Sequence, residues 1–131
     1  MKTIERTSVR TAAETYAVEA EAVRLGADVL VYIWGGERPH IGAVAAAQPR
    51  PSLADPDKTS ATASVLTYVG HKEDQVARET ALALAARLNT NVVVSAGIHW
   101  DGLSADGVGI IVDRCREITA KLTDALHGEA G

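Results

Sequence analysis

The chain has 131 residues, of which 47% are hydrophobic, and a formal net charge of −4 with a pI near 5.5. This length suits a single domain over residues 1–131 that buries about two-thirds of the surface exposed by the unfolded chain. Clustered Lys and Arg supply most of the affinity for phosphate backbones, so the acidic balance argues against a nucleic-acid binder. Phe is absent. We therefore expect a core of small aliphatic side chains, with Trp34, Trp100 and the three tyrosines as its few large members.

Cysteine content and hydropathy indicate the compartment. Cys115 is the single cysteine and lies in a predicted helix, so no intrachain disulfide can form, which suits a reducing cytosol. The sequence opens without the apolar run of a signal peptide, and no later stretch has about 20 uninterrupted apolar residues. We expect a cytoplasmic protein with no membrane segment, in which Cys115 is a core residue rather than a nucleophile.

The N-terminal third predicts strands. Residues 1–13 are polar and without clear period, as in a loose arm or a short edge strand. From Tyr16 to Leu25, apolar residues alternate with Glu19 and Glu21, which is the period of a half-exposed strand. A link of only three residues, Gly26 to Asp28, leads into the next apolar run. Two strands joined so tightly are expected to be antiparallel.

The segment from Val29 to Gln48 predicts a β-hairpin. Two apolar arms, Val29–Trp34 and Ile41–Ala47, flank an insert that contains two glycines and a proline, residue types that reverse a strand. Together with the preceding strand, the hairpin would form a three-stranded meander. Because the arms are almost wholly apolar, we expect both of their faces to be covered.

The remaining elements complete a mixed fold. Residues 49–60 hold three of the four prolines and predict an exposed loop. Residues 61–69 predict a fourth, antiparallel strand, residues 73–88 a helix, and residues 92–98 a buried strand reached by a parallel crossover. Residues 110–126 predict a second helix. The order β-β-β-β-α-β-α predicts an α+β fold, in which two helices cover one or both faces of a mixed, mostly antiparallel sheet.

Histidines mark candidate sites for chemistry. His40, His71 and His99 fall in short connections, and Asp101 follows His99 by two residues. Neutral imidazole can ligate a metal, act as a general base or bind a phosphate or carbonyl group. A His/Asp metal site is one hypothesis, although the spacing matches no established metal motif and leaves the metal unknown. The alternative is separate surface histidines that make local hydrogen bonds.

Two further patterns have competing interpretations. The glycine-rich residues 101–109 open a helix, so their backbone N–H groups could hold a phosphate, or Ser104 or Asp106 could cap the helix. A Ser95–His99–Asp101 triad can be written down, but no nucleophile elbow accompanies it.

Tryptophan next to flexible or polar residues suggests a site for a flat ligand. Trp34 precedes Gly35 and Gly36, and Trp100 follows His99, so a planar ring could stack on either indole. Core packing is the alternative for both tryptophans. Arg38 and Lys72 could supply charge to such a ligand, although solvated surface is the usual location of both residue types.

Three segments together resemble a known family. GGERPHIGAVA, TSATASVLTYVGHKE and SAGIHWDGLS occur in an order similar to that of the small LpdD-like proteins, the D components that accompany UbiD-type aromatic acid decarboxylases. The resemblance spans roughly residues 13–126. It implies a fold like that of proteasome assembly chaperones, often in dimers, and an accessory role as a chaperone or carrier of prenylated FMN. Positions to test first are Gly35, Gly36, His40, His71, His99 and Asp101.

We therefore expect a non-catalytic accessory protein that binds prenylated FMN or FMN, or that stabilises the decarboxylase large subunit. The ring would stack near Trp34 or Trp100, and Gly35-Gly36 would allow close approach. His40, His71 or His99, with Arg38 and Asp101 nearby, would meet the polar edges or the phosphate. Two alternatives stay open: a small metal-dependent enzyme that uses the His/Asp set, and a structural subunit without a ligand that docks a partner through a sheet edge or helix stripe.

Overall fold

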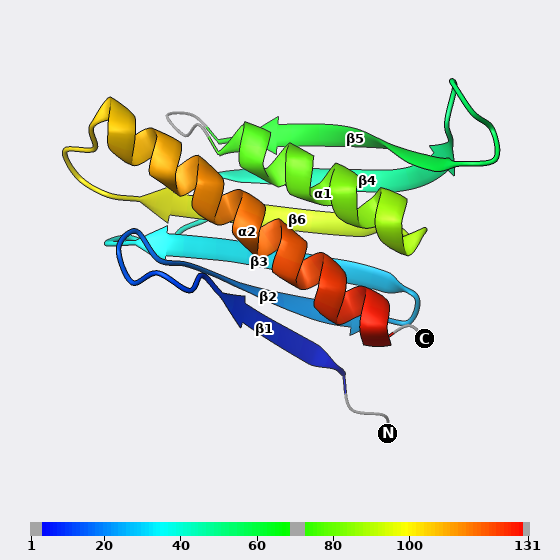
Figure 1. The fold of residues 1–131 in the computed structure, drawn as a ribbon, viewed down its shortest axis with the longest axis horizontal. Coiled ribbons are helices and arrows are strands. Elements are labelled where there is room, and N and C mark those ends of the chain that lie inside the picture. The colour runs from blue at the N-terminus through cyan, green and yellow to red at the C-terminus, as the bar shows by residue number, and fades with distance from the viewer. Residues whose placement is uncertain (1–3, 69–72, 130–131) are drawn as a thin grey trace.

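A computed structural model describes residues 4–68 and 73–129. It contains a single six-stranded sheet and two helices (Figure 1). Within these residues neither helix is long and apolar enough to cross a membrane. In chain order the elements are β1 (Arg6–Arg10), β2 (Val18–Leu25), β3 (Asp28–Gly36), β4 (Ala43–Pro51), β5 (Thr59–Thr67), α1 (Asp74–Leu88), β6 (Val92–His99) and α2 (Ala105–Glu129).

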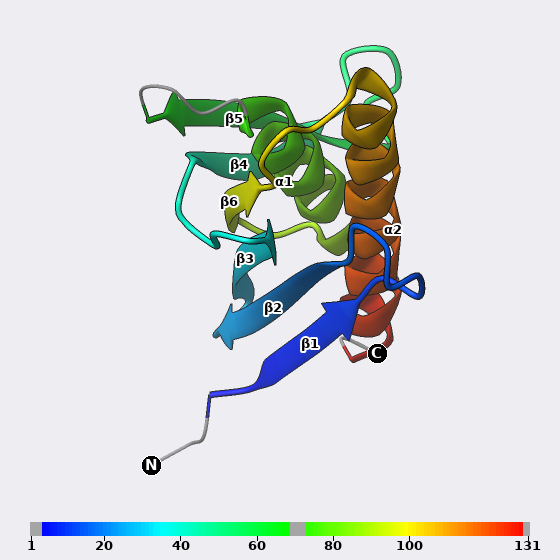
Figure 2. The same cartoon turned by 90° about the vertical axis from the view of Figure 1, so that its left-hand side faces the viewer.

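The sheet has the strand order β1-β2-β3-β6-β4-β5, and both helices pack on the same face of it (Figures 1 and 2). The predicted α+β class, the mixed sheet and the two covering helices are thus confirmed. The N-terminal segment supplies the edge strand β1, which runs antiparallel to β2. The expectation that both faces of the central strands are covered is wrong for the described chain, because both helices lie on one side.

The predicted β3–β4 hairpin is also wrong. β6 lies between the two strands, parallel to β3 and antiparallel to β4. Residues 37–42 therefore do not form a tight turn: they span the width of β6 and bulge from the side of the sheet opposite the helices (Figure 2). Consecutive strands pair in only about two-thirds of cases, and here a later strand with a strongly β-branched sequence takes the central place.

The other strand predictions hold. β2 and β3 are antiparallel, with Leu25 opposite Asp28 and a positive φ of 64° at Gly26 in the turn. β5 pairs antiparallel with β4, and β6 follows α1 as the parallel neighbour of β3. The predicted meander of β2, β3 and β4 does not form, however, because β4 does not pair with β3.

The loop in the proline-rich segment is shorter than the predicted residues 49–60. β4 continues to Pro51, where Pro49 pairs with Ala61 and Pro51 with Thr59, so only residues 52–58 connect the two strands. The β4–β6 pairing ends at Ala47, and beyond it β4 has a neighbour on one side only. A proline is tolerated there because its missing N–H is not needed by a second neighbouring strand.

Helix α2 begins five residues earlier than predicted because Ser104 caps it. The backbone N–H of Gly107 donates to Ser104 Oγ at 3.1 Å. This confirms the capping interpretation of Ser104, and Asp106 lies in the first turn, where a carboxylate favours the positive helix end.

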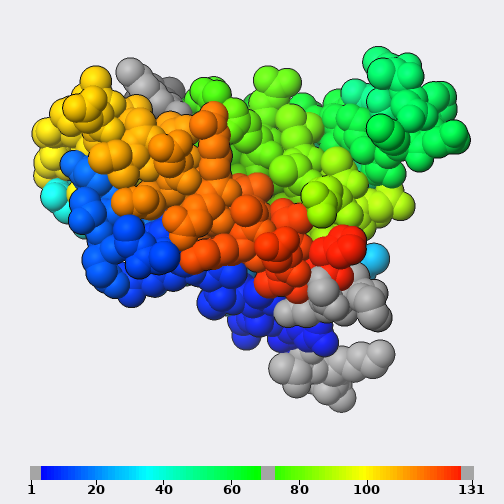
Figure 3. Space-filling model, in the orientation of Figure 1, coloured from blue at the N-terminus to red at the C-terminus, as the bar shows by residue number. Residues whose placement is uncertain are grey.

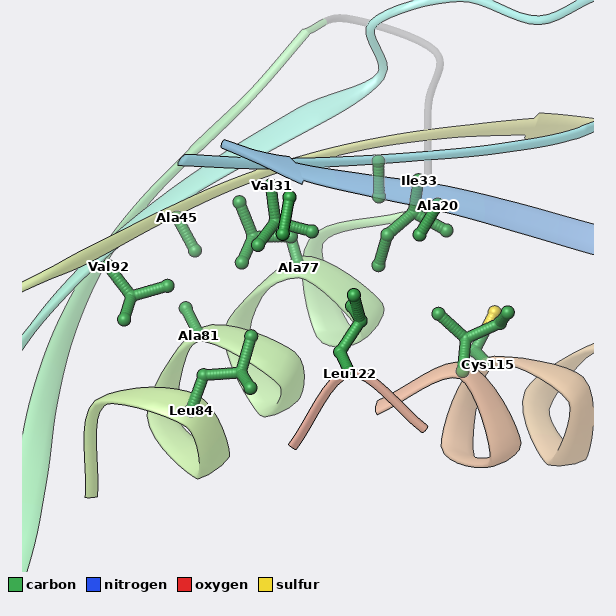
Figure 4. Close-up of a cluster of buried hydrophobic side chains, with 14 of the residues drawn as sticks. Ala20, Val31, Ile33, Ala45, Ala77, Ala81, Leu84, Val92, Cys115 and Leu122 are labelled. Carbon is green, nitrogen blue, oxygen red and sulfur yellow. The ribbon is translucent and has the colours of Figure 1, made fainter. Parts of the chain in front are cut away.

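The core lies between the sheet and the two helices and consists of small aliphatic side chains (Figure 4). Viewed from the helix side, α1 and α2 cover the middle of the molecule (Figure 3). Cys115 is buried here, and desolvation raises the pKa of its thiol to about 12, as expected of a core cysteine. The largest fully buried side chains are Ile33, Leu84, Ile118, Leu122 and Leu126.

Tyr16 and Trp100 are half-buried and pack against the core, as predicted for its large members. The prediction is wrong for Tyr32 and Tyr68, which are exposed, and for Trp34, which is half-buried outside the core. The reason is strand alternation: Val31 and Ile33 face the helices, so Tyr32 and Trp34 must face the other way. The aromatic residues of β3 are therefore available at the surface.

The side of the sheet away from α1 and α2, called the open face below, is apolar at its centre. Successive strands alternate so that every second residue points to it. It presents Leu30, Tyr32 and Trp34 from β3, Val93 and Ser95 from β6, Val44 and Ala46 from β4, and Ser64 and Leu66 from β5.

Candidate functional site

The main candidate site is a hollow of about 570 Å³ on the open face, called the face hollow. Its floor comes from β3 and β6, and its wall is the connection between β3 and β4. Tyr32 and Trp34 stack on each other at the floor, with ring centroids 5.8 Å apart and planes inclined by 26°. The lining is almost entirely apolar. Its side chains are Leu30, Tyr32, Trp34, Pro39, His40, Ile41 and Ser95.

Glycines allow the backbone of the β3–β4 connection to lie close to the sheet. A Cβ at position 97 would collide with the backbone carbonyl of His40, so only glycine lets the connection cross β6 at this height. Gly36 adopts a positive φ of 87°, and its backbone lies against that of His99. The N–H of Gly42 then donates to Ala96 O at 2.9 Å, which anchors the far end of the connection.

His40 is held in place by two partners. Its Nδ1 lies 2.8 Å from the carbonyl oxygen of Arg38, which can only accept, so Nδ1 carries a proton. Its Nε2 lies 3.0 Å from Glu73 Oε1, at the beginning of α1. The backbone N–H of Ile98 donates to the same carboxylate oxygen at 3.3 Å. This half-buried pair ties the wall of the face hollow to α1 and β6.

Tyr32 and Ser95 line the face hollow but were not predicted as binding residues. Glu73, which contacts His40, was not predicted either. Its place at the start of a helix already explained a carboxylate through the helix dipole. The only further signal is Gly42, where a Cβ would collide with the Glu73 carboxylate, and no sequence pattern links these positions.

A second cluster lies at the rim, where β3 and β6 end. Arg38 donates to Asp101 Oδ1 at 2.8 Å, and His99 Nε2 lies 2.8 Å from the same oxygen. Hydrogen bonds with His99, Glu37 and Arg38, in decreasing order of effect, lower the pKa of Asp101 to about 2, so this exposed carboxylate is ionised at neutral pH. The carboxylate favours the tautomer of His99 in which Nε2 donates.

The rim also has a smaller hollow of about 440 Å³, called the rim hollow, which includes Trp34, Gly35, Gly36 and Trp100. Trp100 packs edge-on against Tyr16 at 5.2 Å between ring centroids. A Cβ at Gly35 would lie 3.3 Å from the indole of Trp100 and 3.1 Å from the Ala17 carbonyl oxygen. These glycines therefore accommodate close packing within the chain itself.

The structure brings together most of the predicted site residues, but in two places. Trp34 and His40 line the face hollow, while Gly35, Gly36 and Trp100 line the rim hollow beside it. Arg38, His99 and Asp101 form the rim cluster. His71 and Lys72 lie outside the described residues.

The described residues do not assemble a Ser-His-Asp triad or a metal site. His99 and Asp101 are in contact, but Ser95 lies four residues back along β6, about 13 Å away in an extended strand. In the part of the chain that the structure describes, no group of three or more His, Cys, Asp or Glu side chains is placed to hold a metal ion. Because His71 is not described, the predicted four-residue metal set stays untested as a whole.

Comparison with solved structures finds a similar fold. A chain in the crystal structure of a novel chaperone complex for yeast 20S proteasome assembly aligns over 98% of each chain, with a TM-score of 0.57 and 16% identity. At this identity the likeness concerns the fold alone. No curated protein matches the chain. A family model for the prenylated flavin chaperone LpdD-like domain matches residues 12–127. The chain belongs to this family.

Proposed function

We propose that this protein is a non-catalytic carrier that binds the ring of prenylated FMN, or of FMN, in the face hollow. The stacked Tyr32–Trp34 pair at the floor is the observation that carries the proposal. Flat ring systems bind on aromatic faces with about 1–3 kcal/mol per stacked ring. The hollow, at about 570 Å³, is within the range of about 300–1,000 Å³ that is usual for small-ligand pockets.

The polar groups of the hollow suit a ring with hydrogen-bonding edges. Its polar side chains are His40 and Ser95, together with the indole N–H of Trp34 and the Tyr32 hydroxyl, whose hydrogen bond to Glu21 raises the pKa of the phenol. An apolar pocket with a few polar groups at its edge is the usual design of a cofactor site. When bound, prenylated FMN supplies its own chemistry to a decarboxylase, and this chain would only hold and orient it.

The absorbance spectrum after co-expression with a flavin prenyltransferase tests the proposal. We expect the wild type to purify with a flavin chromophore. Ser95→Phe should abolish it, because the added ring fills the hollow from the floor. Ser8→Phe, on the exposed part of β1, is the matched control and should keep the chromophore. Circular dichroism checks that both variants fold. A colourless wild type would contradict the proposal.

The recipient in this proposal is the large subunit of a UbiD-type hydroxyaryl acid decarboxylase in the cytoplasm. Support comes from the family, whose name joins a prenylated flavin to a chaperone role. Incubating the flavin-loaded protein with cofactor-free decarboxylase should transfer the chromophore and restore activity. If the flavin-loaded Ser8→Phe variant and the wild type both fail to transfer it, delivery is excluded and direct stabilisation of the enzyme is left.

A homodimer formed through the open face belongs to the same proposal. The Tyr32–Trp34 stack projects from β3, on one side of β6. On the other side, β4, β5 and the beginning of β6 line a hollow of about 340 Å³ that includes small side chains such as Ala46 and Ser64. In a face-to-face dimer with its two-fold axis in the plane of the interface, the aromatic pair of each copy would pack on the apolar open face of the other.

The size of the face is adequate for such a dimer. Six strands at about 4.8 Å spacing and about eight residues long span roughly 25 Å by 25 Å. The flat area of the face is close to the ~800 Å² that each partner buries in a standard interface, because projecting side chains add to the accessible surface. The second copy would then cover the mouth of the face hollow and exclude water from the ring.

Light scattering on the untagged full chain tests the dimer. We expect a dimer for the wild type, a monomer for Ser64→Arg, which places a charge in the hollow, and a dimer for Thr59→Arg on the opposite face of β5. Quenching of Trp34 fluorescence by acrylamide should be weak in the dimer, with Trp100→Phe removing the second indole. A monomeric wild type, or a dimer with fully quenchable Trp34, would contradict this arrangement.

A further inference from the structure

The charge around the face hollow is unusual for a site that binds a phosphorylated cofactor. Among the described residues that line it, none is a lysine or an arginine. A flavin mononucleotide carries a phosphate with close to two negative charges, and proteins commonly bind such groups with Arg forks, lysines or helix N-termini. Within the described residues, the floor and wall therefore match the ring of the cofactor and offer no cation for its phosphate.

The arginines closest to the hollow already have carboxylate partners. Arg38 lies 2.8 Å from Asp101, Arg10 lies 2.9 Å from Glu14, and Arg6 lies 3.3 Å from Glu21. Five carboxylates stand among these three arginines around β2, the rim hollow and the rim cluster. They are Glu14, Glu19, Glu21, Glu37 and Asp101. A phosphate approaching this region would meet more negative than positive charge.

His40 does not provide a phosphate donor either. Both of its ring nitrogens are engaged, one with the Arg38 carbonyl and the other with the Glu73 carboxylate. Turning the ring toward a ligand would break both contacts and release the wall from α1. His40 therefore shapes the hollow and presents the edge of its ring to the ligand.

We propose that the face hollow recognises the ring system of the flavin and leaves its phosphate outside, in solvent. This inference rests on the proposed function and specifies which part of the ligand is recognised. It assigns Arg38, His99 and Asp101 to the structure of the rim rather than to cofactor binding. A carrier that holds only the ring leaves the phosphate available to the recipient enzyme, whose own phosphate site can then draw the cofactor away.

Paired ligands that differ only in the phosphate test this inference. The untagged full chain is titrated with FMN and riboflavin, and with prenylated FMN before and after phosphatase treatment, by calorimetry and by quenching of Trp34 fluorescence. We expect dissociation constants within about threefold for each pair, and a change of less than threefold between 50 and 300 mM NaCl. A phosphate clamp predicts about tenfold or more, because hydrogen bonds to charged groups are the strong ones.

Arg38→Gln supplies the matched variant, because it removes the nearest rim cation and keeps a polar side chain of similar length. We expect unchanged affinity for both members of each pair. Tenfold selectivity for the phosphorylated ligand, or a loss in Arg38→Gln confined to that ligand, overturns this inference and leaves the proposed function intact. Absence of binding by all four ligands removes the proposed function and the inference together.

Discussion

The two faces of the sheet are made by the same strands and serve different purposes. On the helix side, Val31 and Ile33 of β3 are at most 2% exposed and pack among alanines and valines. On the open side of the same strand, Tyr32 is 37% exposed and stacks on Trp34. Residues one position apart thus belong to the core and to the candidate site, respectively.

This difference explains the unusual composition. A core of small side chains lets α1 and α2 approach the sheet closely without Phe or Trp, since dispersion contacts need close packing rather than large groups. The scarce aromatic residues are then placed where a ligand or a second copy can use them. Stability and binding are therefore separable by mutation along a single strand.

The largest expected contrast is between Ile33→Ala and Tyr32→Ala. Ile33→Ala leaves a cavity in the core and should lower the free energy of unfolding by about 2–5 kcal/mol. Tyr32→Ala should cost about 1 kcal/mol, mostly from the lost stack with Trp34, but weaken flavin binding at least about tenfold. Urea unfolding and flavin titration measure the two effects. Equal losses of stability in both variants would contradict the division between the faces.

A smaller effect is expected at the point where the connection crosses the open face. Gly97→Ala forces the His40 carbonyl away from β6 and should destabilise the fold by about 1–3 kcal/mol, as overpacking does. Flavin binding should fall as well, since the wall of the face hollow moves. Gly109→Ala is the control, because a Cβ there meets nothing within 4 Å, and it should stabilise α2 by about 0.5–1 kcal/mol. Thermal unfolding of both variants separates the two cases.

The smallest effect is expected at the rim, where the two faces meet. The pKa of Asp101 is about 2 in the folded protein and near 4 in unfolded chains. Its contribution to stability is therefore present above about pH 4 and is lost as the pH falls toward 2. An NMR titration of the Asp101 carboxyl should give this low midpoint, and His99→Gln should raise it. A midpoint near 4 in the wild type would show that the rim cluster does not form in solution.

Local patterns allowed much of the architecture to be predicted. Alternation in β2, the helical stripe that contains Cys115 and Ile118, and the cap at Ser104 all depend on neighbours within a few residues. Strand pairing was harder to predict from the sequence. The sequence around Gly35 and Gly36 has the composition of a hairpin turn, and only the competition of β6 for the place beside β3 shows that it is a crossing connection.

The residues of the candidate site likewise divide into those that local sequence patterns predicted and those that they did not. Trp34 was identified because it precedes two glycines, and His40 because it falls in a short connection between predicted strands. Glu73 and Ser95 were not identified as parts of the same site, because their contacts with the β3–β4 connection join residues that are tens of positions apart.

By itself, the sequence determined the elements, the small-residue core and the family, since periodicity, caps and segment order are properties of the chain. The tertiary structure decided that β6 separates β3 from β4, that both helices cover one face, and that Tyr32 and Trp34 are left at the other. The physical reason is that one helix layer on a sheet buries only every second residue of each strand. Which half of an apolar strand is buried depends on where distant elements pack, and no local pattern specifies that.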